Sequence, residues 1–402
     1  MAIEIRLITD AEVPAYREAM LTTFGDDVES DPTGADRIRA LCDPSRLWAA
    51  FDGATIVGTA GTFDFDLVVP GGGRLAMAGL TMVMVRPSHR RRGLLRQLVR
   101  LHLDDAARRG VAISSLWASE ASIYGRFGYG LAAEGDALEI KRAGSIDASR
   151  GRELDATEWL DEARARAVLP AIYERAIARR PGALIRSEAW WRERRFVEEP
   201  FMRGSASRRR YVAARRGSEL VGYLQYRQRP SFTDGLPSGR LDIVELVATD
   251  ARAEATLWQL ACHVDLFPTV TWWNAPVDDA LVWSVADARR IARRRTDTLW
   301  LRIADVPAAL AARTYAADGA LCIAVEDAAF ELVVERGAPH CAPAVRAPEL
   351  RMSRAALGAL YLGGVPASRL ARADLVHGDA AALATADRMF ASAIAPWCPE
   401  VF

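Results

Sequence analysis

The feature that most constrains the fold of this chain is a plan of strands and helices that occurs twice. In the first copy, a hairpin leads to a long apolar strand at Leu75–Val85, then to a basic loop and a helix. In the second copy, a hairpin at Tyr211–Gln228 leads to a strand at Leu241–Asp250, followed by a helix and another strand. Strands that alternate with helices in this order are typical of α/β domains. Because internal repetition divides a chain into units, we expect two related domains in succession.

The length agrees with this division and leaves room for a third domain. The chain has 402 residues, and single cores seldom grow beyond about 250 residues. The repeat predicts domains at residues 1–148 and 149–296, with a helix at Glu158–Ala178 in the second. A helix at Pro307–Tyr315, short strands and two more helices then indicate a small α+β layer at residues 297–402. The predicted fold class is therefore α/β (α+β).

Composition excludes several classes of protein and partner. Half of the residues are hydrophobic and 26% are charged, which excludes a mainly disordered chain. The 52 basic and 52 acidic side chains cancel, so we expect no nucleic-acid partner and no general attraction to an anionic membrane. The five cysteines are widely spaced and no histidines cluster, so we expect no disulfide framework, no metal site and a reducing cytoplasmic location. No stretch of about 18 apolar residues occurs, so we expect no membrane span.

The basic loop of the first copy is the strongest indication of function. It runs from Arg90 to Arg96, after a strand and at the start of a helix. The first N–H groups of a helix lack partners within the helix, so they can hold a phosphate that Gly93 lets approach closely. A solvated basic turn, or a patch that contacts nucleic acid, is the alternative. The second copy reads TDARAEATLW here, without the glycine and most of the cations, so we expect it to have lost any such site.

These motifs resemble those of a known superfamily. The acetyl-coenzyme A loop of GNAT N-acetyltransferases follows the pattern Arg/Gln-x-x-Gly-x-Gly/Ala, and this chain has Arg90-x-x-Gly93-x-Leu95, with leucine in place of the second small residue. VMVRPSHRRRGLLRQL, SEASIYGRFGYG, the degenerate second copy and the carboxyl-terminal Phe402 together resemble the enhanced intracellular survival (Eis) family over nearly the full length. That resemblance implies an active N-terminal GNAT fold, a degenerate central GNAT fold, a sterol-carrier-like third domain and a homohexamer.

The resemblance also implies acetyl-CoA as the co-substrate. In this fold, the long strand separates from its neighbour beyond Val83, and its free backbone groups can pair with the amide-rich pantetheine arm. Bulky side chains do not prevent such pairing. The implied coenzyme contacts are Val83, Met84, Val85, Arg91, Arg92, Gly93, Leu94, Leu95, Arg96, Ser119 and Glu120.

The aromatic segment ASIYGRFGYG at residues 121–130 has two interpretations. Its aromatic side chains could fill a core under a turn, which explains Phe127 well. By the resemblance, Tyr124 aligns with the general acid of the family. When an amine attacks a thioester, a thiolate is expelled, and a phenol with an ordinary pKa of about 10 can protonate it. We therefore expect Tyr124 to be catalytic.

The general base is not evident from the motifs. The two motifs contain one histidine, His89, and its place in the basic loop suits phosphate contact or capping. In the family, the free carboxylate of the last residue serves as the base, which here is Phe402. Two prolines stiffen the end of the chain, and Trp397 and Val401 are apolar, so we expect the end to dock rather than fray. Docking for stability alone is the alternative.

The resemblance further implies an amine-binding wall. Phe24 and Asp26 lie at the end of the first helix, where this fold places its acceptor pocket, and Glu400 lies near the carboxyl terminus. The acidic run at residues 26–31 could instead be a solvated loop. Some family members carry a tryptophan in the second helix, where this chain has Asp36, so we expect a more acidic pocket.

We therefore expect an acetyl-CoA-dependent N-acetyltransferase that acts by direct transfer, with no metal and no covalent enzyme intermediate. By the resemblance, its small-molecule amine acceptors include aminoglycosides, at several positions, and its other acceptors include lysine side chains of peptides. Negative charge and space are enough to bind such polyamines. The competing class is a non-catalytic scaffold protein that binds coenzyme A or, through its third domain, a lipid.

Overall fold

The computed structural model describes residues 3–27, 32–141, 143–198 and 203–402. These residues form two compact units, and the chain passes between the units more than once. The first unit comprises Met1–Ala133, Pro181–Arg195 and Asp297–Phe402, and the second comprises Glu134–Arg180 and Phe196–Thr296.

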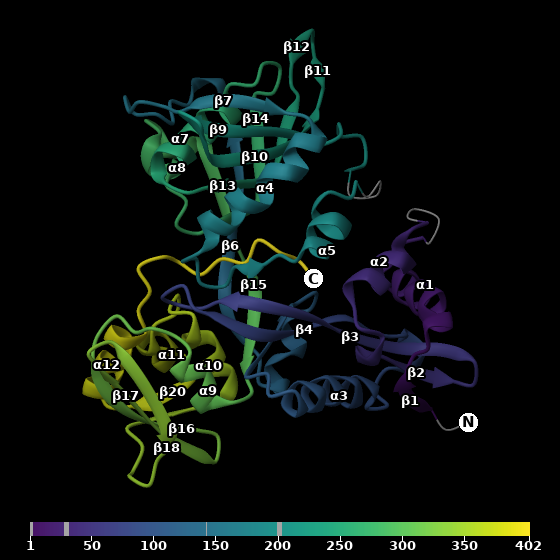
Figure 1. Cartoon of the computed structure of the whole chain (residues 1–402), viewed down its shortest axis with the longest axis vertical. Coiled ribbons are helices and arrows are strands. Elements are labelled where there is room, and N and C mark those ends of the chain that lie inside the picture. Colours follow the sequence, from purple (N-terminus) through teal and green to yellow (C-terminus); the bar gives the residue numbers. More distant parts are fainter. Residues whose placement is uncertain (1–2, 28–31, 142, 199–202) are drawn as a thin grey trace. The chain divides into compact units, whose positions relative to one another are not determined.

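The first unit contains a twisted sheet in the order β1-β2-β3-β4-β5-β15 (Figure 1). β4 and β5 are parallel, and the other neighbours in this order are antiparallel. A short strand, β8 (Leu184–Ile185), also pairs with β3. The strands are β1 (Glu4–Leu7), β2 (Leu47–Asp52), β3 (Thr55–Val68), β4 (Arg74–Val85), β5 (Ile113–Trp117) and β15 (Ile291–Ile303).

Helices cover both faces of this sheet. On one face lie α1 (Val13–Phe24) and α2 (Gly34–Leu41), and on the other lies α3 (Leu94–Arg108). α3 buries Leu98 and Val99 against the sheet, as the spacing of its apolar residues predicts. The two faces therefore carry separate hydrophobic clusters around the same strands.

The last part of the chain forms the predicted α+β layer. Its sheet has the order β18-β17-β16-β19-β20, in which β16 and β19 are parallel. The elements are α9 (Val306–Ala311), β16 (Gly319–Val325), β17 (Ala328–Glu335), β18 (Ala338–Pro343), β19 (Leu350–Met352), α10 (Arg354–Tyr361), α11 (Ala367–Arg372), β20 (Val376–Gly378) and α12 (Ala380–Phe390).

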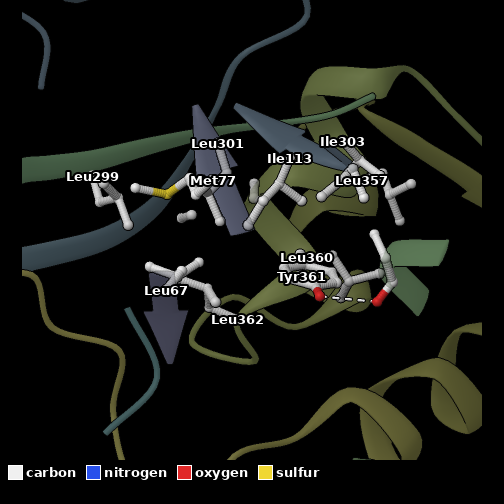
Figure 2. Packing of buried hydrophobic residues seen from close by; sticks show 14 of the residues in the cluster. Leu67, Met77, Ile113, Leu299, Leu301, Ile303, Leu357, Leu360, Tyr361 and Leu362 are labelled. Carbon is white, nitrogen blue, oxygen red and sulfur yellow. Dashed lines mark hydrogen bonds between the residues drawn. The ribbon is translucent and has the colours of Figure 1, made fainter. Parts of the chain in front are cut away.

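One hydrophobic core joins this layer to the sheet of the first unit. Figure 2 shows Met77 of β4, Ile113 of β5 and Leu301 of β15 beside Leu357 of α10. The hydroxyl of Tyr361, also on α10, donates a 2.9 Å hydrogen bond to the carbonyl of Ala309. Because this core is shared, the carboxyl-terminal segment that follows α12 begins on a body fixed to β4 and β5.

The second unit repeats the plan of the first. β9 (Arg210–Arg216) and β10 (Glu219–Arg229) form an antiparallel hairpin, and β13 (Arg240–Ala248) runs parallel to β14 (Thr269–Pro276) with α7 (Ala251–Cys262) between them. Its strand order is β6-β14-β13-β10-β9-β7. The other elements are β6 (Gly130–Lys141), β7 (Ala156–Leu160), α4 (Glu162–Ile177), β11 (Phe232–Thr233), β12 (Leu236–Pro237) and α8 (Leu281–Ser284).

Two predicted helices differ from the structure. The stretch predicted as a helix at Glu158–Ala178 begins as a strand, β7, and the helix α4 starts only after Asp161, whose side chain accepts a 2.7 Å hydrogen bond from the N–H of Arg164. The predicted helix at Pro307–Tyr315 ends at Ala311, because the chain turns to bury Arg313. Among the described residues, no helix is long and apolar enough to cross a membrane.

Candidate active site

The basic loop forms a helix N-terminus that is open to an anion. β4 leads through a short turn into α3, and Gly93 occupies the N-cap position with φ of +80°. Glycine adopts this conformation without strain and has no side chain to cap the helix. The N–H groups of Leu94, Leu95 and Arg96 begin the helix and lack partners one turn earlier. They can therefore bind a phosphate.

The arginines of the loop are free to contribute charge. Arg90, Arg91, Arg92 and Arg96 are exposed, and within the described part of the chain none of them has an ion-pair partner within 4.0 Å. His89, by contrast, already lies 3.1 Å from Asp52 through Nε2. The loop histidine thus has a side-chain partner in Asp52, at the end of β2.

The leucine that departs from the GNAT pattern faces inward. Leu95 is half-buried and packs on the cluster that includes Leu98 and Val99. Its side chain therefore points into the protein, and its backbone N–H remains part of the first turn of α3. The departure at this position does not close the helix N-terminus.

β4 and β5 separate earlier than expected. Their parallel pairing joins only Met77–Gly79 to Ile113–Ser115, whereas β4 continues to Val85. The separation thus begins beyond Gly79 and not beyond Val83. On its other edge β4 pairs with β3 up to Val85, so the edge facing β5 is the one that can pair with an amide-rich ligand.

Beyond the point where β4 and β5 separate, successive side chains of β4 point to opposite faces of the sheet. Val83 and Val85 belong to clusters under α3, and Met84 belongs to the cluster on the opposite face. A bulge precedes them: Met82 has φ of +51°, and the hydroxyl of Thr59 donates a 2.6 Å hydrogen bond to its carbonyl. A bulge of this kind redirects the backbone of one strand.

The point of separation holds an unsatisfied polar group. Ser115 is opposite Gly79 in the register and is fully buried, and its hydroxyl has no hydrogen-bond partner among the described residues. Buried hydroxyls are normally hydrogen-bonded. This hydroxyl, the free strand edge and the open helix N-terminus are all features that an acetyl-CoA ligand with its amides and phosphates would fit.

Tyr124 lies in the cluster that α3 covers. It is 5% exposed, and its ring meets that of Tyr129 edge-on at a centroid distance of 6.2 Å. Burial, and to a lesser degree the charge of Glu120, raises the pKa of Tyr124 to about 12. Its hydroxyl therefore carries a proton at neutral pH. Ser119 and Glu120, between β5 and Tyr124, are exposed.

The last residue of the chain packs at the point where β4 and β5 separate. The ring of Phe402 lies 4.9 Å from the ring of Phe65, centroid to centroid. A Cβ atom placed on Gly79 would lie 3.0 Å from Cε2 of Phe402. The predicted docking of the carboxyl-terminal end is therefore observed, on the face of the sheet opposite to that of Tyr124.

Glu400, expected in the amine-binding wall, lies in a buried cluster of charged and aromatic side chains. It is 2% exposed, and its carboxylate is paired with Arg186 and accepts a 2.9 Å hydrogen bond from Nε1 of Trp190. Nη1 of Arg195 lies 3.8 Å away. Both carboxylate oxygens therefore have partners within the protein.

The other predicted wall residues are placed differently. Phe24 ends α1 and is 52% exposed, and Asp26 follows it half-buried. Asp36, at the start of α2, pairs with Arg39 at 2.9 Å, which offsets the acidity expected there. Residues 28–31 of the acidic run, including Glu29 and Asp31, lie outside the described residues.

A pocket of about 330 Å³ opens beside the docked end of the chain. Asp64, on its wall, bonds to Arg109 at 2.8 Å and to Arg46. Asp66 lines the pocket and is exposed. The aromatic walls include Phe65, which touches the ring of Phe402. The pocket therefore combines apolar surface with carboxylates, and one of its walls, Phe65, contacts the ring of Phe402. Its lining includes Leu41, Phe63, Phe65, Asp66, Met77 and Trp190.

The corresponding helix of the second unit is closed. Asp250 is the N-cap of α7, and its Oδ1 atom accepts hydrogen bonds of 3.0 Å from the N–H groups of Arg252 and Ala253. A carboxylate thus occupies the place where a phosphate would bind. The described residues also contain no group of three or more histidine, cysteine or acidic side chains that could hold a metal ion.

Sequence reasoning did not identify Arg186 and Trp190 as site residues. Arg186 is 214 positions away from its partner Glu400, so no local spacing connects them. The pair of tryptophans at Trp190 and Trp191 was the available signal, since aromatic residues of this size are usually buried together.

Comparison with known domains defines the class of the protein. Residues 4–132 and residues 182–303 each match an acetyltransferase (GNAT) domain, and residues 306–399 match a sterol carrier protein domain. This confirms the predicted fold class of two GNAT folds followed by a sterol-carrier-like domain. The GNAT domains make the chain an acetyl-CoA-dependent acyltransferase.

Individual relatives narrow the class further. The chain is 35% identical to an uncharacterized N-acetyltransferase of Streptomyces avermitilis over the full length of both. It is 35% identical to the N-acetyltransferase Eis of Mycobacterium tuberculosis over 85% of this chain and 84% of that protein. The crystal structure of Eis1 from Mycobacterium abscessus superimposes with a TM-score of 0.84 and 31% identity, covering 99% of this chain and 100% of that one. The chain therefore belongs to the Eis family of N-acetyltransferases.

Proposed function

We propose that the protein transfers the acetyl group of acetyl-CoA directly to amines of aminoglycoside-like polyamines, at several positions, or to lysine side chains. Tyr124 is the general acid, and the carboxylate of Phe402 is the general base. One observation carries this proposal: the ring of Phe402 packs against Gly79, where β4 and β5 separate. A carboxylate at this place can accept a proton from an amine that approaches the open strand edge.

The coenzyme is held, in this proposal, by backbone groups and by charge. The N–H groups of Gly93, Leu94, Leu95 and Arg96 face its phosphates, and the free edge of β4 at residues 83–85 faces its pantetheine arm. Arg91, Arg92, Ser119 and Glu120, which are exposed, are the further coenzyme contacts in this proposal. Bound there, acetyl-CoA supplies the acetyl thioester.

Tyr124 suits the role of acid because it keeps its proton. Burial raises its pKa to about 12, so the hydroxyl is protonated at neutral pH and can donate to a leaving thiolate. Phe402 supplies the complementary group. A free carboxylate is deprotonated at neutral pH and can accept the proton that an ammonium group loses before attack.

The amine acceptor occupies, in this proposal, the pocket beside Phe65. The exposed carboxylate of Asp66 attracts cations, whereas Asp64 is already bonded to Arg109 and Arg46. Phe63 and Trp190 provide apolar surface. Asp26 and Phe24 remain candidate contacts on the same face. Negative charge in a roomy site favours polyamines without requiring one fixed orientation.

The proposal also covers the cellular location and the oligomeric state of the protein. The five cysteines are free and buried, which suits the reducing cytoplasm. A homohexamer is proposed from the resemblance to the Eis family, and the exposed apolar side chains of Trp159, Phe232, Leu236 and Trp283 are candidates for its contacts. The domain limits at residues 1–148, 149–296 and 297–402 belong to the same proposal.

The decisive experiment measures thiol release from acetyl-CoA with a panel of aminoglycosides and lysine peptides. The Tyr124→Phe variant should lose about two to four orders of magnitude in kcat, the range for general acids. Tyr129→Phe is the matched control, because its hydroxyl bonds to Ser114 at 2.7 Å in the buried core and should affect stability alone. Equal rates for Tyr124→Phe and the wild-type protein would show that Tyr124 is not the general acid.

The alternative is a scaffold that binds coenzyme A or a lipid without turnover. The sterol carrier match at residues 306–399 favours it. Binding of acetyl-CoA with no turnover against the whole amine panel would support this alternative. Calorimetry should give one coenzyme per chain, because Asp250 already caps α7; two per chain would contradict a silent second domain.

A further inference from the structure

A buried ion pair lies two residues before the end of the chain. The side chains of Arg186 and Glu400 are 0% and 3% exposed, and Nε of Arg186 donates to Oε1 of Glu400. Trp190 donates from Nε1 to the second oxygen at 2.9 Å, and Arg195 lies 3.8 Å from it. Both oxygens of the carboxylate are therefore held from defined directions.

Arg186 is itself fixed to the sheet that carries the active site. Its guanidinium lies over the ring of Trp191, with Cζ 4.6 Å from the ring centroid. The preceding residues pair with β3: the N–H of Val68 bonds to the carbonyl of Ala183 at 2.8 Å, and the N–H of Gly182 bonds to the carbonyl of Val68 at 2.9 Å. Arg186 is thus a rigid anchor and not a surface side chain.

The end of the chain is bound to the same segment at several points. The N–H of Trp397 donates to the carbonyl of Pro181 at 2.9 Å, and Arg194 donates to the carbonyl of Val401 at 3.2 Å. Two residues can span at most about 7 Å. A fixed Glu400 therefore confines the carboxylate of Phe402 to a small region next to β4.

The choice of a charged pair at this place is informative. Burying two charges costs free energy, and an apolar pair of similar volume would anchor the chain equally well. A pair with defined donors differs from an apolar contact because it permits one geometry. Glu400 thus fits the role of a directional anchor for the end of the chain.

We propose that the buried pair of Arg186 and Glu400 positions the carboxylate of Phe402 for proton transfer, so that both are positioning residues for acetyl transfer. This inference rests on the proposed role of Phe402 as the general base. It adds that the end of the chain acts only when this pair fixes it to β3 and β4.

The test compares Glu400→Gln, Arg186→Lys and Arg186→Met in the full chain. Loss of the fixed geometry should lower kcat by about tenfold or more, since a misplacement of 1 Å can cost about 100-fold. The dissociation constant of acetyl-CoA should stay within about twofold of the wild-type value, because the coenzyme loop is not touched. Arg186→Lys, which keeps the charge, should retain more activity than Arg186→Met.

A matched control separates positioning from stability. Arg313 is another buried arginine of the same unit, and it donates to the carbonyls of Tyr361 and Phe390 without touching the chain end. Arg313→Met should lower the melting temperature but leave kcat per folded enzyme unchanged. If Glu400→Gln also lowers only the melting temperature, and the pH profile of kcat is unchanged, the inference is overturned.

A chain with one glycine added after Phe402 distinguishes failure of this inference from failure of the proposed function. Loss of turnover in that chain, together with a lower kcat in Glu400→Gln, supports both. Loss of turnover together with a normal kcat in Glu400→Gln overturns the inference alone. Normal turnover in the extended chain overturns the role of the carboxylate and the inference with it.

Discussion

A single methyl group on Gly79 tests whether the ring of Phe402 must lie where β4 and β5 separate. In Gly79→Ala, the new Cβ would lie 2.9 Å from Cε2 of Phe65 and 3.0 Å from Cε2 of Phe402. Ordinary contacts between carbon atoms are about 3.5–4.0 Å, so one ring must move by roughly half an ångström or more. Phe65 is held between Phe63 and Trp190, at centroid distances of 5.7 and 4.9 Å. We therefore expect the ring of Phe402, at the free end of the chain, to move.

The expected magnitudes differ for stability and for activity. Overpacking costs about 1–3 kcal/mol, and replacing glycine by alanine in a strand returns about 0.5–1 kcal/mol. The free energy of unfolding should thus fall by about 2.5 kcal/mol at most. Displacing a reacting group by 1 Å can cost about 100-fold in rate, so kcat should fall by roughly 10- to 100-fold.

The assay combines steady-state thiol release with thermal unfolding of the same preparations. Gly222→Ala in the second unit is the matched control. Its Cβ would lie 2.9 Å from the carbonyl oxygen of Val247, a similarly close contact at a position far from Gly79 in the sequence. It should lower the melting temperature with kcat unchanged. A Gly79→Ala protein with the kcat of the wild-type chain would refute the placement of the terminal carboxylate at the reacting centre.

Two further predictions concern charge. Replacing Arg91 and Arg92 together by alanine should raise the dissociation constant of acetyl-CoA by about tenfold at low salt, with a smaller effect at 0.5 M salt because exposed charges are screened; an effect independent of salt would contradict phosphate contact. In the second unit, burial and then the neighbouring Glu254 raise the pKa of Asp279 to about 7. The folded state therefore keeps a proton that the unfolded chain releases near pH 4, and stability should fall as pH rises from about 4 to 7. Glu254→Gln, which keeps the acceptor for the N–H of Ala280, should reduce this fall in melting curves between pH 5 and 8, and an unchanged pH dependence would show that the two carboxyl groups do not interact.

Local patterns were enough to predict the repeated plan and the basic loop. The long apolar strand β4, the glycine at the N-cap of α3 and the apolar spacing within α3 are all local signals, because each involves residues close to one another in the sequence. Their positions in the structure agree with the sequence, and Asp250 explains physically why the second copy lacks an open helix N-terminus.

Features that depend on distant partners could not be predicted in this way. β6 is rich in alanine, glycine and glutamate and β15 contains consecutive arginines, so neither sequence favours a strand. They form strands because partners far along the chain pair with them. The same reason applies to Glu400: its charge suggested an amine contact, and only the fold brings Arg186 and Trp190 to it.

The most direct measurement changes only the terminal carboxylate. Cys398 permits ligation of residues 1–397 to a synthetic five-residue end, made once with the natural acid and once with a carboxamide at Phe402. Amidation removes the negative charge and the proton acceptor while the ring keeps its place. The amide should bind acetyl-CoA as the acid does and acetylate amines at least about 100-fold more slowly. Equal turnover by the two ligated proteins would contradict the account.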